Sequence, residues 1–400
     1  MRTTARTLLL IFVFAIPWEY SLDYGSPWGN IARMAGLALL AAAIPAIFQA
    51  GRIRASGPLQ WLAGILFVWL CLTYFWSVEP ATTLSRLPGY LQEIMLVWLV
   101  GEFADSERDL VLLLRAWLGG CAVLAGLTLF SFFSSVEAGE QIRFFAAGQD
   151  PNDTARFLAL GLPVAALLTG QEQDRRKRLF AFLYLPVAFI AIVATASRGG
   201  FIVAAVALVG CAVLLWLTHK RYLLYTIGLA PILIGMILWL IPHGVIERIG
   251  TIADQLHGGD LNRRVNIWQE GWRVFQNAPL IGHGAGTFVS AVGLSPIDTA
   301  HNTALSILVE GGLLGLALGF VIVACCFWMA LAMHGALRLT MLTALTAWAV
   351  ASLVSTTGES RTTWLLFSIV ALVYRMEMAG HCIHSERAHL TGTLASGVSA

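Results

Sequence analysis

Apolar runs of about 20 residues, each long enough to cross a bilayer as a helix, follow one another along most of this 400-residue chain. A transmembrane barrel would instead show alternating strands of about ten residues, whereas these runs are continuously apolar and rich in Leu, Ala and Gly. Charged residues make up 12% of the chain and hydrophobic residues 58%. Its mean hydropathy of +0.75 is too high for a soluble protein. The sequence therefore predicts an all-α, polytopic membrane protein.

The apolar runs predict about twelve transmembrane helices in a single domain over residues 1–380, followed by a disordered tail at 381–400. The first run follows Arg2 and Arg6 as in a signal peptide, but no cleavage motif comes after it, which favours a membrane helix. The expected spans are 7–18, 29–49, 59–76, 87–103, 110–134, 154–169, 179–197, 200–218, 222–241, 301–333, 338–356 and 361–379.

The basic residues of the short connections predict the orientation, because loops rich in Lys and Arg stay in the cytoplasm. One set of connections holds both lysines and eleven of the arginines, so we expect this side, with both termini, to be cytoplasmic. These residues are Arg2, Arg6, Arg52, Arg54, Arg175, Arg176, Lys177, Arg178, Lys220, Arg221, Arg338, Arg375 and Arg387.

Two long polar segments, 135–153 and 242–300, fall on the opposite, external side, and loops of this length tend to carry function. In the second, Val265, Trp268, Trp272 and Phe275 recur at helical spacing. This pattern predicts a short amphipathic helix. It either lies among the lipid headgroups or packs on the outer ends of other helices.

Other features narrow the function. A net charge of +2 with scattered arginines gives no basic face for nucleic acid. The six cysteines show neither metal-ligand spacing nor a disulfide pattern. Asp150 and Asp153 offer oxygens to a cation, but Asn152 or Asp153 is better explained as the N-cap of the following helix. We therefore predict no metal and no other cofactor.

A few arginines stand on the external side, against the topology rule: Arg86, Arg143, Arg198, Arg263, Arg264, Arg273 and Arg361. A guanidinium binds phosphate oxygens through a bidentate fork and keeps its proton, so several that converge would hold a diphosphate. The alternative is that each one snorkels or pairs with an acid such as Glu79, Glu140 or Glu359. Arg198 is the sharpest case, because TASRGG leaves only a tight turn between two apolar runs and its glycines permit close approach.

His301 begins a long apolar run where the second external loop meets the membrane. A helix N-terminus beside arginines would lower the pKa of this histidine and keep it a free base, although capping or packing is the commoner role. Downstream, Gly311, Gly315 and Gly319 predict a close-packed helix face. The run GHGAG at 282–286 could cradle phosphate, but without a Lys-Ser/Thr ending a flexible turn is favoured.

Four stretches together resemble the bacterial O-antigen ligase superfamily, which also contains O-antigen polymerases and O-linked protein oligosaccharyltransferases. They are RFFAAGQDPNDTA at 143–155, ATASRGGFIVA at 194–204, RVNIWQEGWRVFQNAPLIGHGAGTF at 264–288 and AHNTALSILVEGGLLGL at 300–316.

The resemblance implies a membrane-embedded, GT-C-like glycosyltransferase of the bacterial inner membrane with its active site facing the periplasm. The implied partners are membrane lipids, a polysaccharide on undecaprenyl diphosphate as donor, and a sugar hydroxyl of lipid A-core as acceptor. Transfer would invert the anomeric centre without a metal.

In that family Arg198 and Arg264 match basic positions and His301 matches the histidine before Asn302. We therefore expect His301 to act as general base and Arg198, Arg264, Arg143 and Arg86 to hold the diphosphate. We expect Asn302, Arg263 and Arg361 to support them. The alternatives are a polymerase, a protein oligosaccharyltransferase and, from another class, a lipid or solute transporter, although the external charges sit at one surface and no repeat is evident.

Overall fold

The computed structural model describes residues 1–22, 29–54, 56–135, 143–257, 259, 263–295 and 298–396, and these are all-α. Twelve of its helices have 14 residues or more, and each coincides with one predicted span. They are α1 (Arg2–Ala15), α2 (Ile31–Ala50), α3 (Pro58–Leu72), α4 (Pro80–Phe103), α5 (Glu107–Ser135), α6 (Pro151–Gln171), α7 (Arg175–Ala194), α8 (Arg198–Thr218), α9 (Lys220–Leu240), α14 (Thr303–Leu331), α15 (Gly335–Val354) and α16 (Arg361–Ser396).

Eight helices within the described residues are long and apolar enough to cross a membrane, so the chain is a multi-pass membrane protein. They are α2, α3 with its 3-10 extension η2 (Thr73–Trp76), α5, α7, α8, α14, α15 and Arg361–Gly380 of α16. The other four long helices, α1, α4, α6 and α9, lie outside this set, so twelve spans stay a prediction. α16 continues to Ser396, beyond residue 380, where we expected the tail to begin.

α6 is the central helix of the bundle. Every residue from Thr154 to Thr169 is buried, and α6 packs against α5, α7, α8 and α15. Small residues permit this: a Cβ on Gly161 would lie 2.3 Å from the Tyr184 hydroxyl, and one on Gly200 would lie 2.2 Å from the Cβ of Ala155. Close packing of this kind, more than transfer of apolar surface, associates helices in lipid.

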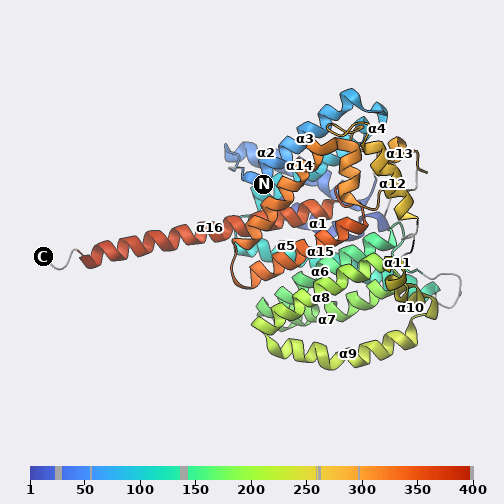
Figure 1. The fold of residues 1–400 in the computed structure, drawn as a ribbon. Helices are drawn as coiled ribbons and strands as arrows, with labels where there is room; N and C mark the ends of the chain where they lie inside the picture. The colour runs from blue at the N-terminus through green and yellow to red at the C-terminus, as the bar shows by residue number, and fades with distance from the viewer. Residues whose placement is uncertain are drawn as a thin grey trace.

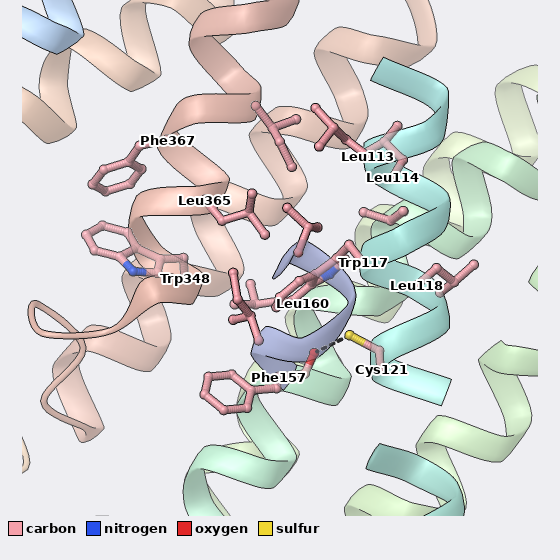
Figure 2. Packing of buried hydrophobic residues seen from close by; sticks show 14 of the residues in the cluster. Leu113, Leu114, Trp117, Leu118, Cys121, Phe157, Leu160, Trp348, Leu365 and Phe367 are labelled. Carbon is pink, nitrogen blue, oxygen red and sulfur yellow. Dashed lines mark hydrogen bonds between the residues drawn. The ribbon is translucent and has the colours of Figure 1, made fainter. Parts of the chain in front are cut away.

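The core around α5 and α6 is apolar and aromatic (Figure 2). Trp117 of α5 is 4% exposed, and the Cys121 thiol donates to the Phe157 carbonyl at 3.6 Å. Trp348 and Phe367 pack edge to face on α15 and α16, with ring centroids 4.9 Å apart. The described cysteines are free, as predicted.

Four short helices, α10 (His243–Gly250), α11 (Ile252–His257), α12 (Arg264–Phe275) and α13 (Phe288–Val292), gather at one end of the bundle, called here the loop face (Figure 1). The C-terminal part of α16 projects from the opposite end, the tail face (Figure 1). There Arg54 pairs with Asp105 at 2.5 Å and Arg115 with Glu172 at 2.5 Å. The basic residues that we expect to be cytoplasmic belong to this end.

The predicted amphipathic helix is α12, and it packs on another helix. Phe275 is buried in a cluster with Phe288, Leu305 and Val309, which joins α12 to α13 and the start of α14. The Trp268 indole donates to the Ala300 carbonyl at 2.9 Å. α12 is therefore fixed over the loop-face end of α14, next to His301.

α14 is broken at Gly312, whose φ of 66° is left-handed. The GHGAG segment fills the break, and its N–H groups are taken: His283 bonds the Val309 carbonyl at 2.8 Å and Gly284 the Glu310 carbonyl at 2.9 Å. Ala285 bonds the Thr73 hydroxyl at 3.0 Å, and Gly286 bonds the Glu310 carboxylate at 2.9 Å. The expected flexible turn is thus wrong: the segment is fixed, and these N–H groups do not face a phosphate.

Candidate functional site

The turn between α7 and α8 is the centre of the candidate site. It orients two arginines through its carbonyls: Arg143 Nε donates to Thr195 O at 3.3 Å, and Arg248 Nε, from α10, donates to Ala196 O at 3.2 Å. Ser197 caps α8, accepting from the Gly200 N–H at 3.1 Å. Residues distant in sequence therefore meet at the position where TASRGG predicted a functional turn.

Asn152 ties the start of α6 to the same turn. Its Oδ1 accepts from Arg143 Nη2 at 3.1 Å and from the Ser197 hydroxyl at 2.8 Å. Arg198, the first residue of α8, donates from Nη1 to the Thr251 hydroxyl at 3.1 Å, and that hydroxyl donates to the Arg248 carbonyl at 2.8 Å. Arg143, Arg198, Arg248 and Arg264 form what we call the cation cluster.

The charges of the cation cluster act on one another. Burial, then the charges of Arg248, Arg264 and Arg198, lower the pKa of Arg143 to about 10, although Asp150 opposes this. Burial and the charge of Arg198 likewise lower the pKa of Arg264. Like charges gathered in a half-buried place are costly unless an anion joins them, so the cluster is suited to bind one.

His301 lies beside the cluster, just before α14. Asn302 caps that helix, accepting from the Leu305 N–H at 3.0 Å, and its amide donates to the Leu353 carbonyl at 3.4 Å. Thr299 Oγ1 lies 3.3 Å from His301 Nδ1. Burial, and next the charge of Arg264, lower the pKa of His301 below its ordinary 6.5. The imidazole is therefore neutral at neutral pH and able to accept a proton.

Three non-glycine residues within the described chain have a left-handed backbone, and all three border this site. They are Ala196 with a φ of 50°, Arg263 with 66° and His301 with 49°. Each forms a functional position or lies within two residues of one, since Arg198 follows Ala196 by two residues and Arg264 follows Arg263 directly. Strained backbone of this kind costs on the order of 1–3 kcal/mol and tends to persist where function requires it.

The acids at the start of α6 lie differently from the prediction. Asp150 is the N-cap, accepting from the N–H groups of Asn152 at 2.7 Å and Asp153 at 3.3 Å, so the assignment of Asn152 or Asp153 as cap was wrong. Pro151 takes the first helical position, so the cap falls on Asp150, two residues before Asn152. Asp153 instead pairs with Arg156 at 3.0 Å.

Arg86, which we expected to hold the diphosphate, and Arg361, which we expected to support it, lie in a separate pocket of about 290 Å³. This polar pocket carries four carboxylates and three guanidiniums, from Glu19, Glu93, Asp153, Glu359, Arg86, Arg156 and Arg361. Arg86 pairs with Glu359 at 3.4 Å, and Arg361 pairs with Glu19 and bonds Gln92 at 3.0 Å. For these two, the alternative of pairing with a nearby acid is correct. Arg263 is exposed beside α12, and Arg273 pairs with Glu270 at 3.6 Å on the same helix.

Sequence reasoning missed Arg248 and the role of Asn152. Arg248 carries the same signal as the arginines that we selected, since it is a basic residue in the second external loop. The function of Asn152 has no local signal, because its contacts join residues 143, 152 and 197, which only the fold brings together.

These observations define a multi-pass helical membrane protein with a cation cluster and one neutral imidazole at the loop face. Residues 180–320 match the model of the O-antigen ligase family, so this part of the chain is similar to members of that family. Members of the family are membrane glycan transferases that act with lipid-linked glycans. The matched segment contains Arg198, Arg248, Arg264 and His301 but not Arg86, Arg143 or Arg361. No curated protein matches the chain.

Proposed function

We propose that this protein is an O-antigen ligase, which transfers a polysaccharide from undecaprenyl diphosphate to a sugar hydroxyl of lipid A-core. One observation carries the proposal: four arginines gather beside an imidazole whose pKa is lowered, and three of them, together with the imidazole, lie in the segment that matches the O-antigen ligase family. A diphosphate has the charge opposite to that of the arginines, and a sugar hydroxyl has the proton that a neutral imidazole accepts.

In the reaction that we propose, His301 takes the proton of the acceptor hydroxyl as its oxygen attacks the anomeric carbon. The bond from that carbon to the diphosphate oxygen breaks, and the configuration inverts. Arg143, Arg198, Arg248 and Arg264 stabilise the negative charge of the departing polyprenyl diphosphate. Fixed charges in a half-buried site are effective here because they need not reorient as charge develops.

The arginines provide positive charge of the kind that a divalent cation supplies in many reactions of phosphates, so we propose that transfer proceeds with chelator present. We also propose that the loop face is periplasmic, that both termini are cytoplasmic and that the membrane is the bacterial inner membrane. The concentration of basic residues at the tail face supports this orientation.

The test is transfer by the purified protein, given undecaprenyl-diphosphate-linked glycan and lipid A-core with chelator. A ligase yields glycan-bearing lipid A-core. Longer glycan on the polyprenyl carrier would instead identify a polymerase, and transfer only after addition of a divalent cation would contradict the metal-independent reaction. Movement of the lipid-linked glycan across vesicles without transfer would identify a transporter.

The variant His301→Ala tests the mechanism. Loss of a general base lowers the rate about 10²–10⁴-fold, so transfer should nearly cease while donor binding persists. The matched control is His243→Ala, at an exposed position in α10 on the same face, which should keep wild-type transfer. Unchanged transfer in a folded His301→Ala protein contradicts the assignment.

A further inference from the structure

A large apolar cavity adjoins the polar pocket. It has a volume of about 720 Å³ and lies among α3, α14, α15 and α16. Its walls include Leu66, Ile307, Gly315, Phe320, Val350 and Phe367. The two cavities share Tyr90, Thr356 and Glu359, so together they form one site with an apolar and a polar part.

The polar pocket has buried groups that lack partners within the described chain. Glu93 is 6% exposed and Arg156 is 4% exposed, yet Glu93 Oε2, Arg156 Nε and Nη1 and the Thr356 hydroxyl make no hydrogen bond there. Buried polar atoms are nearly always bonded in native proteins. A ligand rich in hydroxyl groups satisfies such a set, because each hydroxyl both donates and accepts.

Charge distinguishes this pocket from the cation cluster. Each of its three guanidiniums pairs with a carboxylate, so its positive charge is already balanced. The apolar part, in contrast, matches hydrocarbon chains. The combined site therefore fits a glycolipid whose sugar lies at the loop face and whose acyl chains lie within the bundle.

Its position relative to the cation cluster suits a transfer reaction. Both adjoin the first turn of α6: Asn152 bonds Arg143 of the cluster, and Asp153 and Arg156 line the polar pocket. His301 lies beside the cation cluster and close to the apolar cavity, because Thr303 and Ala304, which follow it after Asn302, line that cavity. An inverting displacement requires attacking and leaving groups on opposite sides of the anomeric carbon.

We propose that the polar pocket and the apolar cavity together bind the acceptor glycolipid, with its core sugars against Glu93 and Arg156 and its acyl chains along the Gly315–Gly319 side of α14. The role as acceptor site rests on the proposed function. The binding of a glycolipid does not, and it is measured without donor.

The experiment measures binding of lipid A-core, and separately of undecaprenyl diphosphate, to the purified protein by native mass spectrometry. Gly319→Leu fills the apolar cavity, because a Cβ there meets only the Ile307 side chain at 3.6 Å. Its matched control is Gly228→Leu on α9, where a Cβ meets nothing within 4 Å. Val350→Trp is a second cavity-filling variant, used if Gly319→Leu does not fold.

Gly319→Leu should weaken lipid A-core about tenfold or more and leave undecaprenyl diphosphate unchanged, since the bulky side chain takes the space of an acyl chain. Glu93→Gln should weaken both lipid A-core and the deacylated core oligosaccharide, whereas Gly319→Leu should not affect the oligosaccharide. Gly228→Leu should bind like the wild type.

Weaker binding of undecaprenyl diphosphate alone in Gly319→Leu would overturn the proposal, because the cavity would then hold the donor chain. Wild-type affinity for lipid A-core in both cavity-filling variants would also overturn it. If the wild type binds lipid A-core but transfers no glycan, the proposed function fails and the glycolipid site stands.

Discussion

The cation cluster and the polar pocket both adjoin the first turn of α6, and both contain arginines, but they differ in what those arginines contact. In the cluster, Arg143 bonds the Thr195 carbonyl and the Asn152 amide oxygen, and Arg248 bonds the Ala196 carbonyl. In the pocket, Arg86, Arg156 and Arg361 each pair with a carboxylate. Both sets are fixed in direction.

The difference teaches how a protein keeps positive charge available. A neutral oxygen orients a guanidinium and leaves its charge in place, whereas a carboxylate orients it and also neutralises its charge. The charges of the cluster therefore still act on each other, as the lowered pKa of Arg143 shows. The basic residues that matter for an anion are those held by neutral partners, and counting external arginines does not reveal which these are.

The largest effect should come from removing one arginine of the cation cluster, compared with removing one arginine of the polar pocket. Arg198→Gln should lower kcat/KM about 10²–10³-fold, because loss of one donor to the developing charge of a leaving group costs that much. Arg86→Gln should leave the KM for donor within about twofold, since this half-exposed arginine is already paired. Steady-state transfer assays at saturating acceptor measure both. An equal rise in the KM for donor in the two variants would contradict the distinction between the arginines of the cluster and those of the pocket.

A smaller effect should follow from making the cluster resemble the pocket. Asn152→Asp keeps the acceptor for Arg143 and Ser197 but adds a negative charge. Donor affinity should fall about tenfold, because the added carboxylate repels the diphosphate of the donor in a half-buried site. The reciprocal variant Asp153→Asn, one residue on and facing Arg156, should leave donor affinity unchanged. Binding of undecaprenyl diphosphate by isothermal titration checks both, and an unaffected Asn152→Asp would exclude Arg143 from the donor site.

The cluster should also set the pH dependence of transfer. His301 acts when unprotonated, so activity falls as pH drops through its pKa, which burial and Arg264 hold below 6.5. In Arg264→Gln one cause of that lowering is gone, the pKa of His301 rises, and the acid limb of kcat/KM moves to higher pH. Profiles of the residual activity between about pH 5 and 8 measure the shift. Arg273→Gln on the same helix is the control and should keep the wild-type profile. An acid limb at the wild-type pH in Arg264→Gln would show that Arg264 does not act on the pKa of His301.

The helices were predictable from the sequence because every backbone N–H and C=O group in lipid must be hydrogen-bonded within the protein. For a single apolar run, the α-helix achieves this locally. Twelve expected spans coincide with long helices, and α12 contains Val265, Trp268, Trp272 and Phe275, whose helical spacing predicted a short helix. The break at Gly312 could not be predicted, because it depends on a segment some 30 residues earlier that bonds into it. α6 was expected among the spans, but its burial on all sides shows only in the packing.

For the site, motif residues at the ends of adjacent helices were brought together as expected: Arg143, Arg198, Arg264 and His301. Arg86 and Arg361 were not, because the pairing partners Glu359 and Glu19 lie far away in the sequence. Whether an external arginine faces a ligand or an acid is a question of tertiary contact. Charge and position in the sequence do not answer it.

The smallest effect concerns the ion pair of the polar pocket. Arg86 and Glu359 are 56% and 32% exposed as side chains, so their coupling should contribute only about 0.2–1 kcal/mol to stability. Glu359 also accepts from the Tyr90 hydroxyl at 2.7 Å, so Glu359→Gln should lower the thermal midpoint more than Arg86→Gln does. A double-mutant cycle of the two, read by thermal unfolding in detergent, isolates the pair. Coupling well above that range would mean that Arg86 is held as tightly as the arginines of the cluster. The difference between paired and available charge would then not explain why Arg86 lies outside the donor site.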